Sequence, residues 1–323
     1  MIKNILLTGA TGFIGSHILE LLLEKGYNVI LIYNSSSDFW RIKESIDAHS
    51  KDERIKSYNL GKTGIDEIFN DNKIDCVIHL AAYYRREHSR EDIGRFIDSI
   101  IRLPTLILEN MAKHDVKFFI NTGTFFEYKG SGKPLDEDSV KEAYDLYAAF
   151  KTSFSEVLKY YSANHGIAVA DLKLFAPYGP KDNKKLISYL MKNALDGTEF
   201  TISKSKLEWD WTYVKDIADA YLLAISYLDK RKKGYEVFNI GNSSAVKIKE
   251  MISILEGISG RNMRVSYLKN TIKDSMFYAN CDNSKAIKIL GWKPAYDMKK
   301  GLEETYKYYA EDRRNGRKGY KQH

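Results

Sequence analysis

The chain has 323 residues, 44% hydrophobic and 29% charged, which suits one large or two modest globular domains with a substantial core. No run reaches the about 18 apolar residues that a membrane helix needs, so we expect no contact with a membrane. The formal net charge is +7, but the lysines and arginines are interleaved with acids along the chain, so the surface favours anionic small molecules over nucleic acid.

The first predicted element is a strand over Ile5–Leu7, followed by the glycine-rich stretch Thr8–Gly15 and an amphipathic helix over Ser16–Glu24. The glycine spacing, G-x-x-G-x-x-G, allows a tight turn, a close approach of phosphate to the backbone, and packing of the helix near the strand. The N-terminus of that helix offers free N–H groups and a partial positive charge to an anion. We therefore predict that the loop holds the pyrophosphate of a dinucleotide, with the cofactor-binding residues Gly9, Thr11, Gly12, Phe13, Ile14 and Gly15.

A second buried strand is predicted over Tyr27–Asn34. In dinucleotide folds an acidic residue at the end of this strand accepts the adenosine ribose hydroxyls, and here no carboxylate stands there to repel a 2′-phosphate. This favours NADP over NAD as the cofactor, bound by the hydroxyl, amide and cationic side chains of Asn34, Ser35, Ser36 and Arg41. The alternative is that Ser35–Asp38 only caps a helix that begins near Phe39.

After a short strand over Ile55–Leu60 and a helix near residues 65–70, a fourth strand is predicted over Ile74–Ala82. It ends in the cofactor-binding candidates Leu80, Ala81 and Ala82, whose small alanines allow a cofactor to lie close. His79 lies inside the buried strand, so we expect it to make a structural hydrogen bond rather than to act as a base.

Two aromatic and two cationic side chains stand at the carboxyl end of this strand, where parallel sheets bind ligands. They are either sugar or phosphate contacts or part of a solvated loop: Tyr83, Tyr84, Arg85 and Arg86.

A long helix is predicted over Asp92–Ala112, with Pro104 as a kink, and a fifth strand over Val116–Asn121. That strand runs into Thr122, Gly123 and Thr124, and a further helix follows from Tyr144 to about Asn164.

Tyr147 and Lys151 are four residues apart and share one face of this helix. A tyrosine hydroxyl can act as a general acid near neutral pH only if its pKa falls from about 10, and a lysine ammonium one turn away stabilises the phenolate. The lysine can also bond the nicotinamide ribose, and Thr124 can hold the substrate oxygen against the tyrosine hydroxyl.

Together these motifs make the sequence resemble the extended short-chain dehydrogenase/reductases that act on nucleotide sugars as epimerases, dehydratases or reductases. Further stretches carry the resemblance over nearly the whole chain: Leu174–Pro180, Trp211–Ala218, Phe238–Gly241 and Leu290–Pro294. The resemblance implies an α/β fold with a Rossmann-type doubly wound parallel sheet and a smaller mixed α/β C-terminal domain. It implies a cofactor-binding domain over residues 1–177, with returning segments near 212–241, and a sugar-nucleotide domain over 178–323.

The resemblance also assigns roles to single residues. The resemblance implies that Tyr147 is the acid/base, that Lys151 adjusts its pKa and that Thr124 is its hydroxyl partner. It also implies that Thr122 and Pro177 contact the cofactor. The substrate, a nucleotide-diphosphate sugar, is expected to meet Tyr83, Arg85, Thr124, Phe125, Phe126, Tyr178 and Lys273. A homodimer paired through the helices near residues 92–112 and 147–164 is implied by resemblance alone.

One departure from the family pattern bears on the reaction. Dehydratases of this group carry an Asp-Glu pair directly after the catalytic threonine, and here Phe125 and Phe126 stand there, which cannot transfer protons. This excludes 4,6-dehydration and leaves two reactions, 4-epimerisation with retained NAD or net reduction of a 4-keto sugar. The missing acid after the second strand favours NADPH-dependent reduction, and Tyr83–Arg85 resembles the same stretch in reductases that make 3,6-dideoxyhexoses on cytidine diphosphate.

Other departures from the family pattern affect the residues that bind the diphosphate. The family's arginine before Asp210 is Trp209 here, a second arginine is replaced by Lys273, and the asparagine before Pro177 is Ala176. Substitute cations are candidates among Lys184, Lys185, Lys204 and Lys206, each of which can equally be a solvated surface lysine. A non-catalytic dinucleotide-binding regulator is the third function considered, and the intact Thr124, Tyr147 and Lys151 argue against it.

The remaining expectations concern the C-terminal half and the cysteines. Asp216 is predicted to be the N-cap of a helix that follows it, two more helices are expected over 248–258 and 299–310, and the basic run Arg313–Lys318 is expected to be a frayed tail. Cys76 and Cys281 stand far apart without metal-ligand spacing, which predicts a reducing compartment and no metal site. With no signal peptide before the first strand, we expect a cytoplasmic protein.

Overall fold

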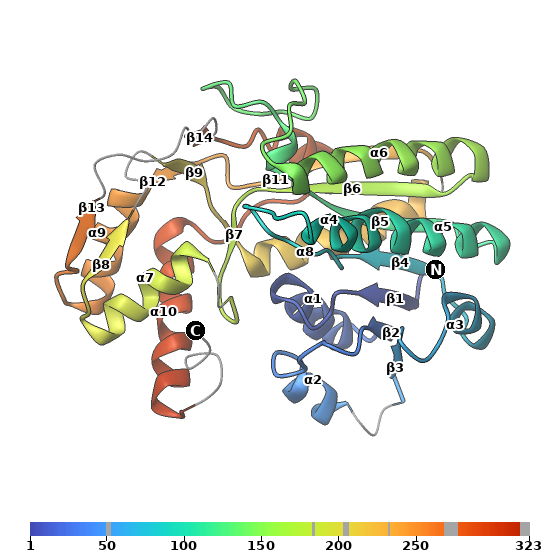
Figure 1. Ribbon diagram of the computed structural model, residues 1–323, viewed down its shortest axis with the longest axis horizontal. Coiled ribbons are helices and arrows are strands. Elements are labelled where there is room, and N and C mark those ends of the chain that lie inside the picture. The colour runs from blue at the N-terminus through green and yellow to red at the C-terminus, as the bar shows by residue number, and fades with distance from the viewer. Residues whose placement is uncertain (50–52, 183–184, 203–206, 232, 268–276, 317–323) are drawn as a thin grey trace.

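The computed structural model describes residues 1–49, 53–182, 185–202, 207–231, 233–267 and 277–316. Its centre is a parallel sheet of seven strands with helices on both faces (Figure 1). From edge to edge the strands are β11 (Tyr235–Ile240), β6 (Ala168–Leu174), β5 (Phe118–Thr124), β4 (Cys76–His79), β1 (Asn4–Thr8), β2 (Asn28–Tyr33) and β3 (Ile55–Asn59). The chain leaves β1 toward one edge and returns to β4 on its other side, so the predicted doubly wound sheet is confirmed.

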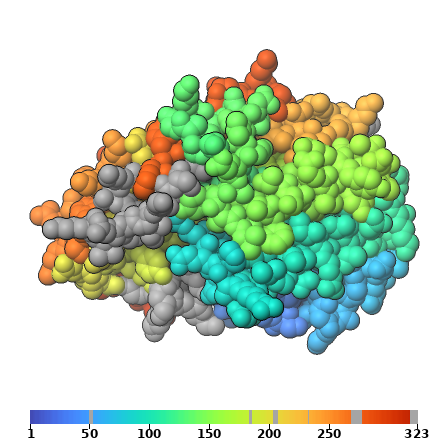
Figure 2. All heavy atoms as spheres, turned by 45° about the horizontal axis from the view of Figure 1, so that its top comes forward, coloured from blue at the N-terminus to red at the C-terminus, as the bar shows by residue number. Residues whose placement is uncertain are grey.

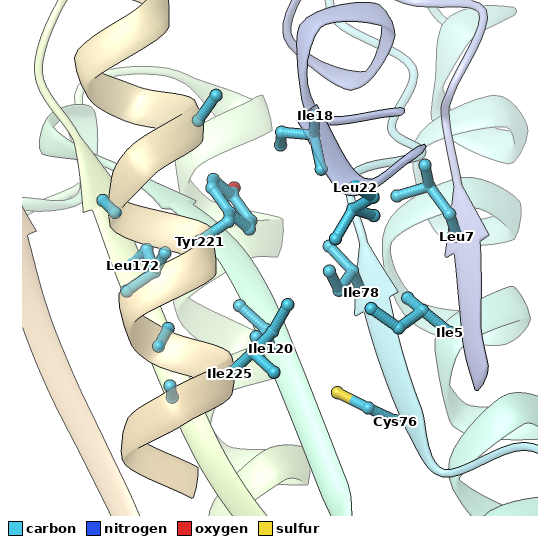
Figure 3. Packing of buried hydrophobic residues seen from close by; sticks show 14 of the residues in the cluster. Ile5, Leu7, Ile18, Leu22, Cys76, Ile78, Ile120, Leu172, Tyr221 and Ile225 are labelled. Atoms are coloured by element: carbon cyan, nitrogen blue, oxygen red, sulfur yellow. The ribbon is translucent and has the colours of Figure 1, made fainter. Parts of the chain in front are cut away.

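The two faces of the sheet bury alternate residues of each strand, as the period of two requires. In β1, Ile5 and Leu7 face one core while Leu6 faces the other. The first core is closed by two helices, α1 and α8, whose Leu22 and Tyr221 approach the strands in Figure 3. The second is closed by α3, α5 and α6.

The helices predicted over 16–24, 65–70 and 144–164 are all present around the sheet. The helical elements around the sheet are α1 (Phe13–Glu24), α2 (Lys43–Ala48), α3 (Ile65–Asp71), α4 (Asp92–Phe96), the π-helical η1 (Ile97–Arg102), α5 (Leu103–Lys113), the 3-10 turn η2 (Phe125–Glu127), α6 (Leu146–His165), α8 (Val214–Arg231) and the π-helical η3 (Ala286–Leu290). Within the described residues, no helix has the length and apolar character to cross a membrane.

Two helix predictions need correction. The long helix after residue 92 is not α-helical throughout, because a π-helical stretch precedes Pro104, which has no N–H for the bond that an α-helix would make there. The helix expected to begin near Phe39 begins at Lys43, because residues 39–42 form a turn closed by the bond from the Ile42 N–H to the Phe39 carbonyl.

The smaller part of the molecule has its own apolar core, which includes Leu190, Met251 and Leu302. Its strands pair both parallel and antiparallel, so the predicted smaller mixed α/β part is confirmed. Its elements are β7 (Pro177–Tyr178), α7 (Leu186–Asp196), β8 (Phe200–Ile202), β9 (Glu208–Asp210), β10 (Thr212–Tyr213), β12 (Ala245–Lys247), α9 (Ile248–Ser259), β13 (Val265–Tyr267), β14 (Tyr278–Ala279) and α10 (Met298–Arg314).

The prediction that Asp216 is an N-cap is wrong. Helix α8 begins two residues earlier, and the Asp216 carboxylate accepts hydrogen bonds from the backbone N–H groups of Ala295 at 2.9 Å and Tyr296 at 3.1 Å. Burial raises the pKa of Asp216 to about 6. The residue thus ties a distant loop to α8, a contact that no local pattern encodes.

The predicted frayed tail is also wrong for its first residues. Arg313 lies in α10, donates a hydrogen bond to the Leu195 carbonyl at 2.6 Å and pairs with Asp196 at 3.0 Å. The last two residues of the basic run, at 317 and 318, lie outside the described residues.

Candidate active site

In the loop between β1 and α1, Gly9 and Gly15 leave no room for a side chain. Gly9 has φ +73°, and a Cβ added to it would lie 2.7 Å from the backbone nitrogen of Ala81. A Cβ on Gly15 would lie 2.1 Å from the Gly9 carbonyl oxygen. Helix α1 therefore starts directly against the loop, and its N-terminal N–H groups face the carboxyl end of the sheet, the geometry that favours an anion.

Thr8 and His79 lock the neighbouring strand end to this loop. The Thr8 hydroxyl oxygen accepts bonds from the backbone N–H groups of Leu80 at 3.1 Å and Ala81 at 3.0 Å, and it lies 2.9 Å from Nδ1 of His79. Since the oxygen already accepts twice, its hydrogen must point to His79, whose proton then sits on Nε2. Burial lowers the pKa of His79 well below its ordinary value, so it has the structural role expected of it.

Thr124, Tyr147 and Lys151 meet where β5 ends and α6 begins. Helix α6 is started by Asp145, whose carboxylate accepts from the Ala148 N–H at 2.8 Å, and this places Tyr147 and Lys151 in its first turns. The Lys151 ammonium donates to the Thr122 carbonyl at 2.8 Å and lies 5.8 Å from the centre of the Tyr147 ring.

The Thr124 hydroxyl is oriented by its own turn. Its oxygen accepts from the Phe126 N–H at 3.3 Å, so its hydrogen remains available to a ligand. Thr124, Tyr147 and Lys151 all line one cavity of about 760 Å³.

The pKa of Tyr147 departs from the prediction. Burial, and secondarily the neighbouring Tyr84, raises it above the ordinary value, whereas the Tyr147–Lys151 pair by itself predicts a fall toward neutrality. Burial also lowers the pKa of Lys151, to about 8. In this structure Tyr147 therefore holds its proton, the state that a proton donor requires.

The cavity runs from the glycine loop, past the strand ends, to the smaller part of the molecule. Beside Thr124 it is walled by aromatic rings: Phe125 and Phe126 lie 5.2 and 5.5 Å from Trp209, centre to centre. Within the described chain, none of the residues that line it is an aspartate or a glutamate. Among the lining residues are Gly9, Gly12, Phe13, Ile14, Gly15, Leu80, Ala82, Tyr84, Arg86, Thr122, Thr124, Phe125, Phe126, Tyr147, Lys151, Pro177, Lys185, Tyr189, Trp209 and Trp211.

Not every predicted cofactor residue lines this cavity. Asn34, Ser35 and Ser36 lie in an exposed turn in which the Asn34 side-chain oxygen accepts from the Ser36 N–H at 3.1 Å and from its hydroxyl at 2.8 Å. Arg41 donates to the Thr11 carbonyl at 3.3 Å and to the Lys181 carbonyl at 2.9 Å, which places its guanidinium beside the glycine loop.

The stretch after β4 presents the opposite side chains from those predicted. Tyr83 donates to the Asp92 carboxylate at 2.7 Å, and Arg85 pairs with the same carboxylate at 3.4 Å. Both point away from the cavity, while their neighbours Tyr84 and Arg86 line it. The cause is Asp92, which also accepts from the Ser89 N–H, so the extended segment is fixed on one side and every second residue faces the cavity. In Figure 2 this segment, in cyan, lies on the surface beside the green residues of α6.

Two further substrate residues are not where we expected them. Tyr178 is 1% exposed and packs against Tyr213 in the core of the smaller part, so it cannot meet a ligand in the cavity. Lys273 lies outside the described residues, as do Lys184, Lys204 and Lys206. Of those candidate cations only Lys185 is described, and it lines the cavity with its ammonium 5.0 Å from the centre of the Phe13 ring.

Sequence reasoning left out several lining residues. Tyr189 and Asn193 lie one turn apart on the face of α7 that begins at Lys185, and a search for one helix face starting from that lysine could have found them. Trp211 carried no such signal, because a buried strand residue is indistinguishable in sequence from one that borders a cavity.

Comparison with known proteins adds to this geometry. Residues 5–241 match the NAD dependent epimerase/dehydratase family. The chain is 30% identical to a UDP-glucuronate 4-epimerase of Thermodesulfobacterium geofontis, over 95% of this chain and 96% of that protein. It is 27% identical to a CDP-abequose synthase of Salmonella typhimurium, over 94% of this chain and 98% of that protein.

Solved structures show the same likeness. The UDP-glucuronic acid 4-epimerase of Bacillus cereus, in complex with UDP-glucuronic acid and NAD, superposes with a TM-score of 0.84 at 27% identity, covering 95% of this chain and 98% of that one. The UDP-glucose 4-epimerase of Thermotoga maritima with UDP-glucose has a TM-score of 0.84, also at 27% identity, covering 96% and 99%.

Proposed function

The chain belongs to the NAD dependent epimerase/dehydratase family, and within that family we propose that it reduces a nucleotide-diphospho-4-keto-(di)deoxy sugar at C4 with NADPH. The observation that carries the choice of reduction is the missing acid at the end of β2, and the content of the cavity argues against dehydration. Thr124, Tyr147 and Lys151 are present, and among the described lining residues there is no carboxylate. Dehydration needs further groups to move protons at neighbouring carbons, and Phe125 and Phe126 fill that place.

The proposed roles follow from the side chains. Thr124 donates its free hydroxyl hydrogen to the C4 oxygen and orients the ketone. Tyr147 gives its proton to the same oxygen as the alkoxide forms, and its raised pKa keeps that proton in place beforehand. Lys151, held by the Thr122 carbonyl, supplies positive charge beside the phenolate that Tyr147 becomes.

The cavity fits a dinucleotide, because the glycine loop leaves backbone exposed where a Cβ would collide and an anion can meet the start of α1. When bound, NADPH supplies the hydride. We propose that the glycine loop, Leu80–Ala82, Thr122 and Pro177 hold it, and that Asn34, Ser35, Ser36 and Arg41 meet a 2′-phosphate. The support is the missing acid at the end of β2, and Arg41 beside Thr11.

The second candidate is a 4-epimerase that retains NAD. It is favoured by the relatives named as 4-epimerases, two of them solved with NAD or with a UDP-sugar. The same cavity serves it, since epimerisation at C4 also moves one hydride and one proton at a single carbon.

The as-purified cofactor and a substrate panel separate the two. We expect exchangeable NADPH, consumed stoichiometrically with CDP-, dTDP-, GDP- or UDP-linked 4-keto-6-deoxy sugars, as followed by the loss of NADPH absorbance. Tightly bound NAD with C4 inversion and no net NADPH loss would overturn the reductase in favour of the epimerase. Neither activity, with cofactor bound, would point to a non-catalytic regulator.

The rest of the proposal concerns the surroundings of the reaction. We propose that the part after residue 177, apart from returning segments near 212–241, binds the sugar nucleotide, with Tyr84 and Arg86 at the sugar and Lys185 at the diphosphate. A cytoplasmic homodimer completes it. Lys185→Ala should lower the affinity for the substrate while leaving the affinity for NADPH unchanged. An equal loss of both affinities would show that Lys185 does not bind the diphosphate of the substrate.

A further inference from the structure

A cluster of buried charges lies directly behind the strand end that carries Thr124. The Lys173 ammonium lies 2.6 Å from the Glu127 carboxylate and 2.8 Å from that of Asp171. All three side chains are at most 1% exposed. Buried charges are costly unless paired, so a cluster like this is retained only where its geometry is well satisfied.

The cluster is fully hydrogen-bonded. The Asp171 carboxylate accepts from the side-chain amide of Asn121 at 2.8 Å and from the Tyr235 hydroxyl at 2.6 Å. The Ser155 hydroxyl lies 3.2 Å from both Asp171 and Lys173. Against the cost of burial, the carboxylates raise the pKa of Lys173, and Lys173 lowers that of Asp171, so this ion pair is charged at neutral pH.

The cluster contacts the backbone of β5 at the end that carries Thr124. The second oxygen of Glu127 accepts from the Thr124 N–H at 3.0 Å, which closes the turn that sets the Thr124 hydroxyl. A Cβ on Gly123 would lie 2.4 Å from the Lys173 side chain and 2.9 Å from Glu127. Glycine between Thr122 and Thr124 is thus what lets the charges lie against the strand.

Lys151 reaches the same strand from α6, whose Ser155 hydroxyl lies 3.4 Å from the Lys151 carbonyl as well as beside Asp171 and Lys173. Lys151 is 1% exposed, and its ammonium donates to the Thr122 carbonyl, one residue before Gly123. The buried charges around this strand end are thus two cations, Lys151 and Lys173, and two carboxylates, Glu127 and Asp171. Burial lowers the pKa of Lys151, while Glu127 and Asp171 raise it and Lys173 lowers it.

The other titratable groups around Lys151 cannot take over this role. His79 in β4 is held neutral by burial, Tyr147 on its own helix keeps its proton, and Tyr221 in α8 is a neutral phenol that shares a hydrogen bond with Thr122. The negative charge that Lys151 meets comes from the cluster.

We propose that Glu127, Asp171 and Lys173 are positioning residues that fix Thr124 at the strand end and keep Lys151 an ammonium through the working pH range. The inference rests on the proposed function for the importance of Lys151 to turnover. The cluster has two carboxylates and one cation, and its net negative charge balances the charge of Lys151. Removing a carboxylate should therefore lower the pH at which Lys151 loses its proton, and removing the Lys173 charge should raise it.

Variants that remove one charge each test the direction of this shift. Glu127→Gln keeps an acceptor for the Thr124 N–H but removes a negative charge, so Lys151 should lose its proton about one pH unit lower, and the basic limb of kcat/KM should move with it. Asp171→Asn should move the basic limb in the same direction, and it replaces Glu127→Gln in the test if that variant does not fold. Lys173→Met should move the limb to higher pH, and the double variant Glu127→Gln/Lys173→Met should bring it back.

The deprotonation of Lys151 is also read without turnover, from the side-chain NMR signals of isotopically labelled lysine, with Lys151 assigned by the signal lost in Lys151→Gln. Glu142→Gln is the matched control, because Glu142 is an exposed carboxylate paired with Lys129 and should leave the titration unchanged. Unmoved titration in Glu127→Gln and Asp171→Asn, or shifts of the same sign in these and Lys173→Met, would overturn the inference. If no substrate turns over, the proposed function fails while the NMR titration still decides this point.

Discussion

Replacing Tyr147 by phenylalanine tests the centre of the proposed chemistry, because the change removes one hydroxyl and little else. The ring of Tyr147 packs edge to face on Tyr84 at 4.9 Å and has the Lys151 ammonium 5.8 Å from its centre, contacts that phenylalanine keeps. Within the described residues the hydroxyl makes no hydrogen bond, so its loss leaves no buried partner unsatisfied. We therefore expect the free energy of unfolding to change by less than about 0.5 kcal/mol.

The effect on turnover should be far larger. A positioned general acid contributes about 10²- to 10⁴-fold, so kcat should fall by that factor, or about 2.7 to 5.4 kcal/mol of activation free energy. The assay is NADPH consumption with the active 4-keto sugar, together with NADPH affinity by fluorescence titration, which should stay within about twofold. Tyr160→Phe, on the exposed face of the same helix, is the control. Turnover within threefold of wild type in Tyr147→Phe would refute Tyr147 as the proton donor.

Three more predictions test the loop, the pH response and the wall beside Tyr147. Gly15→Ala places a Cβ 2.1 Å from the Gly9 carbonyl, so cofactor affinity should fall by more than about tenfold in a titration; unchanged affinity would contradict the packing. His17 has its pKa lowered by burial to about 4, so the unfolded chain binds the proton first and stability falls as pH drops below about 6.5; in urea unfolding His17→Gln should lose about 2 kcal/mol less than wild type between pH 7 and 5. An equal loss would remove His17 from the effect. Tyr84→Ala should raise KM more than Tyr83→Ala, since of the two only Tyr84 lines the cavity. A larger effect of Tyr83→Ala would support Tyr83 as the substrate contact.

Much of this protein was readable from local pattern. Apolar runs of strand length, glycines at fixed spacing and a tyrosine four residues before a lysine each describe geometry within one turn or one strand, and the structure has the sheet, the loop and the pair where the sequence predicts them. The carboxyl ends of parallel strands meet at one edge, so the convergence of Thr124 and Tyr147 with the glycine loop also follows from order along the chain.

What the sequence left undecided depends on partners far along the chain. An extended segment can present either of its two sides, and Asp92 is what turns Tyr83 and Arg85 away and leaves Tyr84 and Arg86 in the cavity. Likewise Asp216 at a helix start resembles a cap until the loop at 295–296 is seen to occupy its carboxylate.

Charge states were decided by the tertiary structure alone. The Tyr147–Lys151 spacing predicts a lowered tyrosine pKa, but burial in the folded cavity raises it. In sequence, Glu127 and Lys173 are 46 residues apart and carry no motif, yet folding joins them at 2.6 Å behind Thr124. Desolvation and Coulomb interaction both depend on distances that only the packed chain fixes, so the sequence determined which groups could do chemistry and the fold determined which of them hold a charge.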